Sequence, residues 1–299
     1  GAEAATEAPA APAATPTVAI VTVAGTIARD SAKPNRAAEG MVTPSEVRSA
    51  LRRAEKDPSV RAVLLRIDST GGDALAAAAI WRDVQLTRRS GKPVVASLGT
   101  YAASGGYMIA TAADVIVAQP GTVTGSIGVL VAKLDLSRWL RRQGIYVHEL
   151  AAGAEQPSFS RGLTRAQRRQ VEAMAGEGYD DFCAKVESGR ALSRRHVRRH
   201  ARGRVWTGEQ AWRRGLVDEL GGIHVALSLA AARAGVESGA KVRHVDFAAK
   251  PAGVLGALGG KDDAPLGAAI GALSAALGSA LLSAIGPELY PALHAVAMA

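Results

Sequence analysis

Apolar and polar residues follow two different spacings along this chain. Short apolar runs predict buried strands, and longer segments with an apolar residue every three or four positions predict helices. The predicted strands are 17–25 "TVAIVTVAG", 61–68 "RAVLLRID", 92–99 "KPVVASLG", 113–120 "ADVIVAQP" and 145–150 "IYVHEL". The predicted helices cover 44–56, 73–89, 104–112, 134–143 and 164–188, with Thr43 opening the first. Strands that alternate with helices indicate an α/β fold with parallel strand pairing.

The two ends of the chain differ in composition from this alternating region. Residues 1–16 are rich in Ala, Pro and Thr, which is typical of an extended linker. Residues 17–250 form the predicted folded domain, and 251–299 form an Ala/Gly/Leu-rich tail expected to be an amphipathic or apolar helix. Within this tail, 265–286 carries no charge and is long enough to span a bilayer, but its Ala and Gly content favours packing on a subunit or a membrane surface. Because the chain begins with Gly1 and has no signal-peptide pattern, we expect it to be a fragment or a processed piece of a longer protein.

The net charge of the chain is +9 and its pI is about 10. Arginines between Arg161 and Arg214 carry most of this charge, but aromatic residues are only 4% and no nucleic-acid-binding motif is present. Solvated helix faces and subunit contacts therefore explain the charge better than a nucleic-acid partner. The single cysteine, Cys183, excludes an intramolecular disulfide and is predicted to be buried.

Three turns that contain glycine or serine follow predicted strands. Ser104 stands in "TYAASGGYMIA", Gly71 and Gly72 end "DSTGG", and Ser126 lies in "GTVTGSIGVL". Small neighbours let a substrate backbone approach a serine hydroxyl, and turns that lead into helices present free N–H groups to a developing oxyanion. The other interpretation is that Ser104 only caps a helix and that the glycines only permit tight turns.

Four segments in this order closely resemble the signal peptide peptidase A (SppA) family of serine-lysine endopeptidases. They are "DSTGG", "GKPVVASLGTYAASGGYMIATAAD", "QPGTVTGSIGV" and "GRVWTGEQAWRRGLVDELGG", within a resemblance that covers about 18–247. The resemblance implies a ClpP/crotonase-like fold of repeated β-β-α units, ring-shaped homo-oligomers at the membrane of the bacterial cell envelope, and cleavage of leftover signal peptides and unfolded chains. It implies no metal or other cofactor.

The resemblance also assigns roles to residues of this chain. Ser104 would be the nucleophile, and the N–H groups of Gly72 and Gly105 would form the oxyanion hole. Ser126 would orient a general-base lysine, and Gly71 and Gly106 would contact the substrate.

The general-base lysine is not found at its expected place. In single-domain members of the family it lies about fifty residues after the nucleophile, where this chain has Gln156. Glutamine cannot shuttle a proton at neutral pH. In tandem-duplicated members the C-terminal half supplies the serine and the N-terminal half supplies the lysine. The chain resembles such a C-terminal half, so we expect a missing N-terminal domain to complete the site.

Other bases and other functions stay open from the sequence. Lys133 follows the Ser126 turn, His148 ends a predicted strand, and His196 and His200 are spaced i, i+4 on a helix. A surface role fits Lys133 better, and the histidine pair has no metal-binding motif around it. The alternatives to a peptidase are a non-catalytic scaffold and, with less support, a crotonase-like acyl-CoA enzyme.

Overall fold

The computed structural model describes residues 16–30, 40–148, 158, 160–236 and 243–247. The Gln156 position and the tail at 251–299 lie outside these residues, as does the predicted linker apart from Pro16. The chain divides into two compact units, one made of 1–128 and 182–250 and the other of 129–181 and 251–299. The predicted boundaries of the peptidase domain at 17 and 250 stay a prediction.

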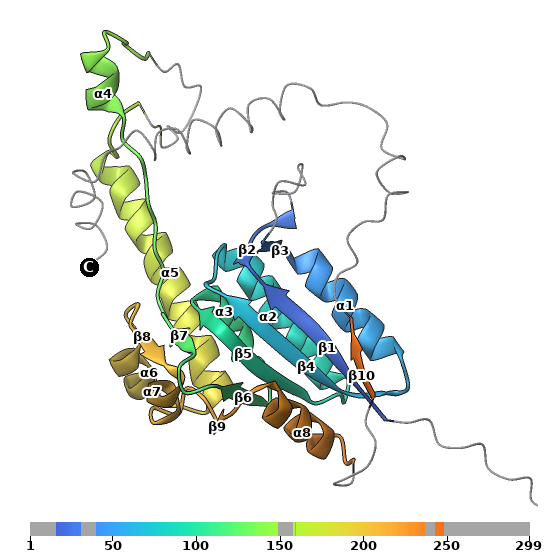
Figure 1. Ribbon diagram of the computed structural model, residues 1–299. Helices are drawn as coiled ribbons and strands as arrows, with labels where there is room; N and C mark the ends of the chain where they lie inside the picture. The colour runs from blue at the N-terminus through green and yellow to red at the C-terminus, as the bar shows by residue number, and fades with distance from the viewer. Residues whose placement is uncertain (1–15, 31–39, 149–157, 159, 237–242, 248–299) are drawn as a thin grey trace, which may run out of the picture. The chain divides into compact units, whose positions relative to one another are not determined.

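A sheet of mostly parallel strands forms the centre of the first unit (Figure 1). Its main path runs β10-β1-β4-β5-β6-β9, and every pair of neighbours on it is parallel. These strands are β10 (Arg243–Asp246), β1 (Thr17–Ala24), β4 (Val60–Ser69), β5 (Val94–Ala103), β6 (Val115–Ala118) and β9 (Glu219–Leu220). The predicted α/β class with parallel pairing is therefore confirmed.

Four short strands lie off this path. β7 (Val123–Gly125) pairs in parallel with the last residues of β5, and β8 (Val205–Thr207) pairs antiparallel with β7. β2 (Thr26–Ile27) and β3 (Met41–Val42) form a separate parallel pair. Two strands precede a helix at β6 and β7, as in a β-β-α unit, whereas β4 and β5 each lead directly into a helix.

Helices cover both faces of the sheet (Figure 1). On one face, α8 (Ile223–Arg233) packs through Ala226 and Ala230 against apolar side chains of the central strands, among them Leu64 and Val117. α1 (Pro44–Lys56) and α2 (Ala74–Arg89) contact each other as well as the strands, and α3 (Gly105–Ala110) packs against α2 and β5. Strands buried on both faces have nearly continuous apolar sequences, which is why the apolar runs located β1, β4, β5 and β6.

The remaining helices are α4 (Ser137–Arg142), α5 (Arg165–Arg190), α6 (Arg194–His200) and α7 (Gly208–Trp212). The predicted start of a helix at Thr43 is confirmed, and Thr43 and Thr207 both form capping boxes, with Glu46 and Gln210 as the reciprocal partners. None of the helices in the described part of the chain has the length and apolar character needed to cross a membrane.

The strand predicted at 145–150 is wrong for its described residues. Residues 145–148 form no strand, and Tyr146 is 74% exposed. A strand needs a neighbour that accepts and donates its backbone hydrogen bonds, and the alternation of Ile145 and Val147 with polar residues cannot show whether such a neighbour exists. The helix predicted at 134–143 is also shorter, because α4 begins only at Ser137.

Tyr107 provides a test of packing beneath α3. Its side chain is fully buried, and its hydroxyl donates a hydrogen bond of 2.8 Å to the Leu216 carbonyl oxygen. Burial raises the pKa of Tyr107 well above its usual value. We expect Tyr107→Phe to lower the free energy of unfolding by about 1–2 kcal/mol, because the buried Leu216 carbonyl loses its donor. Urea unfolding measures this loss, with Tyr146→Phe as an exposed control, and equal midpoints for the two variants would contradict it.

Candidate active site

Three strands of the first unit end side by side. Ala102 of β5 pairs with Ser69 of β4 on one side and with Thr124 of β7 on the other, and Ala103 pairs with Gly125. Because the three strands are parallel, the turns that follow them lie at the same edge of the sheet. The structure therefore brings together the three turns that the sequence singled out, and open α/β sheets bind ligands at this edge.

Ser104 connects β5 to α3 in an uncommon backbone conformation. Its φ is 52° and its ψ is −121°, a combination that costs a non-glycine residue on the order of 1–3 kcal/mol. Its N–H donates to the Gly125 carbonyl oxygen (2.9 Å), and its carbonyl oxygen accepts from the Met108 N–H (2.9 Å). The half-buried side chain makes no capping hydrogen bond to α3, which argues against the interpretation of Ser104 as only a helix cap. The strained turn thus presents the hydroxyl at the sheet edge without using it to cap the helix.

The turn after β4 lies directly against Ser104. A Cβ atom added to Gly71, whose φ is 107°, would come within 2.8 Å of the Ser104 Cβ and 2.9 Å of the Gly105 nitrogen. Ser69 supports this turn, because its Oγ donates to the Gly25 carbonyl oxygen and accepts the N–H of Gly71 (3.1 Å). Only a residue without a side chain fits at position 71.

Two backbone N–H groups beside Ser104 are available to a ligand. Ile27 forms a parallel bridge with Gly72 through hydrogen bonds to the carbonyl of Gly71 and the N–H of Asp73. In such a bridge the N–H of the central residue, here Gly72, points away from the strand that carries Ile27. Gly105 is the first residue of α3, so its N–H has no partner within the helix. These are the two groups that the family resemblance assigned to the oxyanion hole.

Gly106 has a packing role in the structure. It is buried, and a Cβ atom at this position would come within 2.9 Å of the Ser69 carbonyl oxygen. This close contact with Ser69 explains why position 106 is a glycine. The substrate contacts expected for Gly71 and Gly106 stay predictions.

Ser126 directly follows β7, as Ser104 directly follows β5. Its φ is 49°, it follows Gly125 at φ 81°, and its N–H donates to the Arg204 carbonyl oxygen (2.7 Å). The structure thus places Ser104 and Ser126 at the ends of the neighbouring strands β5 and β7, each one residue beyond a paired strand end.

Four lysines lie in the described part of the chain, and no hydrogen bond there joins any of them to Ser104 or Ser126. The Nζ of Lys133 donates to the Arg161 carbonyl oxygen within the second unit. Lys92 donates to two backbone carbonyls and precedes β5, a strand whose ten residues put about 30 Å between its two ends. Burial lowers the pKa of Lys92. Lys185 lies over the Trp81 ring at 5.0 Å, and Lys56 ends α1.

The histidines of α6 have partners of their own. His196 Nε2 donates to the Arg214 carbonyl oxygen (2.8 Å), and the His196 and His200 rings lie 4.7 Å apart. Burial and the nearby cationic groups lower the pKa of His200. Among the described residues no group of three or more His, Cys, Asp or Glu side chains could hold a metal ion.

Comparison with known proteins identifies the family. The sequence profile of peptidase family S49 matches residues 87–237, a range that includes Ser104 and Ser126. The chain belongs to peptidase family S49. This S49 chain is 35% identical over 218 residues to "Protease 4" of Haemophilus influenzae, covering 71% of this chain and 34% of the relative. It is 33% identical over 233 residues to "Serine protease SPPA, chloroplastic" of Arabidopsis thaliana, covering 77% and 34%.

These relatives confirm the family predicted from the motifs. The S49 chain spans about a third of the length of both relatives, and its place as a C-terminal half stays a prediction. Among solved structures, a mutant of the 1510-N membrane-bound stomatin-specific protease matches at a TM-score of 0.48 and 15% identity, covering 78% of this chain and 99% of that one.

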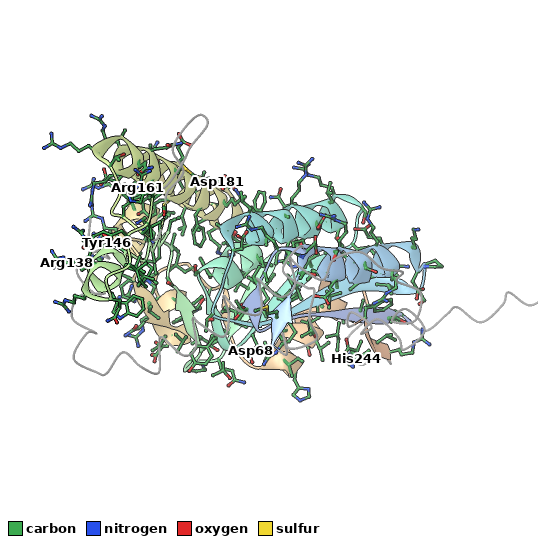
Figure 2. The ribbon with its side chains drawn as sticks, turned by 90° about the horizontal axis from the view of Figure 1, so that it is seen from above. Asp68, Arg138, Tyr146, Arg161, Asp181 and His244 are labelled. Carbon is green, nitrogen blue, oxygen red and sulfur yellow. The ribbon has the colours of Figure 1, made fainter. Side chains whose placement is uncertain are left out.

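Sequence reasoning missed two groups that hold the S49 site together. Asp68, labelled in Figure 2, accepts the Tyr101 N–H and lies where a side chain on Gly99 would collide with its carboxylate. The sequence pattern that could have indicated Asp68 is an acidic residue at the end of an apolar strand. The second group is the 200–214 segment, whose Arg204 carbonyl oxygen accepts the Ser126 N–H.

Proposed function

We propose that this chain carries the nucleophile and the oxyanion hole of a serine endopeptidase. The observation that carries the proposal is the backbone of Ser104, which is held at positive φ beside Gly71 while its hydroxyl makes no capping bond to α3. Family S49 is a peptidase family, which supports the same reaction.

The proposed reaction uses the groups at the sheet edge in order. Ser104 Oγ attacks the carbonyl carbon of the scissile peptide bond while a neutral lysine amine takes its proton. The N–H groups of Gly72 and Gly105 stabilise the oxyanion that forms. The intermediate collapses, the leaving amine takes the proton back from the lysine, and an acyl-serine remains. Water activated by the same lysine then hydrolyses the ester and regenerates Ser104.

The lysine in this proposal comes from another domain or subunit, with Ser126 orienting it. In support, Lys92, Lys133 and Lys185 have other partners, and no described lysine bonds to either serine. A lysine is neutral near pH 7 only when it is partly desolvated. A partner domain that covers this glycine-lined edge would provide that environment as well as the base.

The proposed substrates are unfolded chains and cleaved signal peptides, and the proposed assembly is a ring-shaped homo-oligomer at a membrane of the bacterial envelope. The family resemblance supports both. The second unit adds support for assembly, because Leu130, Tyr146 and Met174 are each more than 60% exposed. Tyr146 and Arg161, which Figure 2 labels, are among the residues that line a pocket of this unit. In the proposed assembly these side chains would be covered by a neighbouring subunit.

Hydrolysis of an unfolded protein tests the proposed function. We expect the natural full-length protein to cleave an unfolded casein substrate, and the isolated 299-residue chain to cleave it at least 100-fold more slowly because it lacks the base. A matched thioester substrate is the control for acyl-CoA chemistry. Thioester turnover without proteolysis would support the crotonase-like alternative, and activity toward neither substrate would support the scaffold.

A further inference from the structure

The segment from Gly203 to Thr207 packs against the Ser126 turn through backbone hydrogen bonds. β8 pairs antiparallel with β7, so that Trp206 stands opposite Thr124 and Val205 opposite Gly125. Beyond this pairing, the Arg204 carbonyl oxygen accepts the Ser126 N–H (2.7 Å), and Gly203 donates to the Ile127 carbonyl oxygen (2.9 Å). The backbone around Ser126 is therefore positioned from one side by β8 and the residues before it.

The Trp206 indole lies against the backbone of Gly125. A Cβ atom on Gly125 would come within 2.8 Å of Trp206 Cδ1 and 3.6 Å of its Nε1. Gly125 in turn connects the two serines, because its carbonyl oxygen accepts the Ser104 N–H (2.9 Å) and Ser126 follows it in the chain. A shift of the indole would therefore displace Gly125 and, with it, the backbone of both serines.

Three contacts fix the indole itself. The Arg214 guanidinium carbon lies 3.8 Å from the centre of the Trp206 ring, which is a close cation–π stack. The indole Nε1 donates to the His200 carbonyl oxygen (3.0 Å), and the His200 imidazole meets the ring edge-on at 5.9 Å. Arg214 is anchored in turn, because its guanidinium donates to the Gln210 carbonyl oxygen (2.7 Å).

We propose that Trp206, clamped by Arg214, is a positioning residue for Ser104 and Ser126. It touches neither the substrate nor the reacting atoms. It sets the place of the Gly125–Ser126 peptide, and through the Gly125 carbonyl it sets the place of the Ser104 main chain. The catalytic part of this inference rests on the proposed peptidase function, whereas the positioning part does not.

The location of the Trp206 contacts determines whether its loss is expected to change kcat or KM. The Gly71–Gly72 turn is held by hydrogen bonds to Ser69 and Ile27 and not by Trp206, so we expect substrate binding at this turn to change little when Trp206 is replaced. The attack of Ser104 depends on its alignment, and small misplacements of reacting groups cost up to about 100-fold in rate. Loss of the indole is therefore expected to lower kcat and leave KM within about twofold.

The test compares Trp206→Leu, Trp206→Phe and Arg214→Ala with Trp212→Leu as the control, all in the full-length protein. Trp212 lies on α7 and is 46% exposed, so its loss removes a tryptophan of the same region without touching Gly125. We expect kcat to fall about 10- to 100-fold in Trp206→Leu and less in Arg214→Ala. Trp206→Phe keeps an aromatic ring over Gly125 and is expected to recover most of the rate.

Amide hydrogen exchange separates this inference from the proposed function. In Trp206→Leu and Arg214→Ala we expect the Ser104 and Ser126 amides to exchange at least tenfold faster, with the amides of β1 and β4 unchanged. Unchanged exchange at both serines would overturn the positioning role, whether or not the protein cleaves peptides. Faster exchange with kcat unchanged in an active enzyme would overturn its catalytic consequence. A wild-type protein that cleaves nothing would refute the proposed function, and the exchange rates would still decide the positioning.

Discussion

Replacing Ser104 by alanine is expected to lower kcat/KM for peptide cleavage by roughly 10⁴- to 10⁶-fold in the full-length protein, because no acyl-enzyme can form. Alanine keeps the Cβ atom that Ser104 already has at this positive φ, so the fold should be unaffected. Cleavage of a fluorogenic peptide measures the rate, and thermal unfolding checks the fold. The residual activity would come from the backbone N–H groups of Gly72 and Gly105, which the substitution leaves in place.

Two other serines make this result specific. Ser228 lies on α8, its hydroxyl donates to the His224 carbonyl oxygen, and Ser228→Ala should retain full activity. Ser126→Ala should fall between the two, because it removes a group that orients the base and leaves the nucleophile. If Ser104→Ala kept more than about a tenth of the wild-type rate, Ser104 would not be the nucleophile.

A side chain at Gly71 should disable the site as well as destabilise it. Gly71 and Gly91 have similar positive φ values, 107° and 90°, so alanine strains the backbone at either position by about 1–2 kcal/mol. At Gly91 no atom lies within 4 Å of the added Cβ, whereas at Gly71 it would come within 2.8 Å of Ser104 and 2.9 Å of the Gly105 nitrogen. Gly71→Ala should therefore cost a further 1–3 kcal/mol from overpacking.

The variants Gly71→Ala and Gly91→Ala together distinguish a loss of catalytic activity from a loss of stability. Because the clash at Gly71 involves Ser104 and Gly105 directly, we expect kcat/KM of Gly71→Ala to fall at least 100-fold per folded molecule. Gly91→Ala should cleave at the wild-type rate, measured well below its unfolding temperature. Equal losses of activity in the two variants would mean that the close approach of the β4 turn to Ser104 is unimportant for the reaction.

The strand segments and the meeting of the three turns could be expected from the sequence for a physical reason, whereas the order of the strands in the sheet was not predicted. Parallel strands buried on both faces have apolar runs, so β1, β4, β5 and β6 were visible as segments, and their carboxyl ends must share an edge. The Gly71–Gly72 turn and Ser104 follow the runs of β4 and β5, whereas Ser126 follows β7, a short strand that no apolar run predicted. The predicted site therefore required only the order of the elements, not their packing.

The features that the sequence did not reveal depend on contacts between distant segments. Trp206 reaches Gly125 only because β8 pairs with β7 across about eighty residues, and no local pattern specifies that pairing. Residues 145–148 have the alternation of a strand, but a strand also needs a neighbour that the alternation does not specify. A lysine that comes from another domain or subunit would leave no mark on this chain beyond the glutamine at position 156.

In the proposed mechanism Ser104 becomes a nucleophile when a base from outside this chain reaches it. Labelling with a serine-reactive fluorophosphonate, followed by mass spectrometry of the adduct, shows whether Ser104 depends on such a base when the isolated chain and the natural full-length protein are compared. We expect an adduct on Ser104 in the full-length protein and little or none in the isolated chain. An adduct on another serine, or none in either protein, would contradict the assignment of Ser104. Equal labelling of Ser104 in both would show that the base lies within this chain, with Lys133 the first residue to substitute.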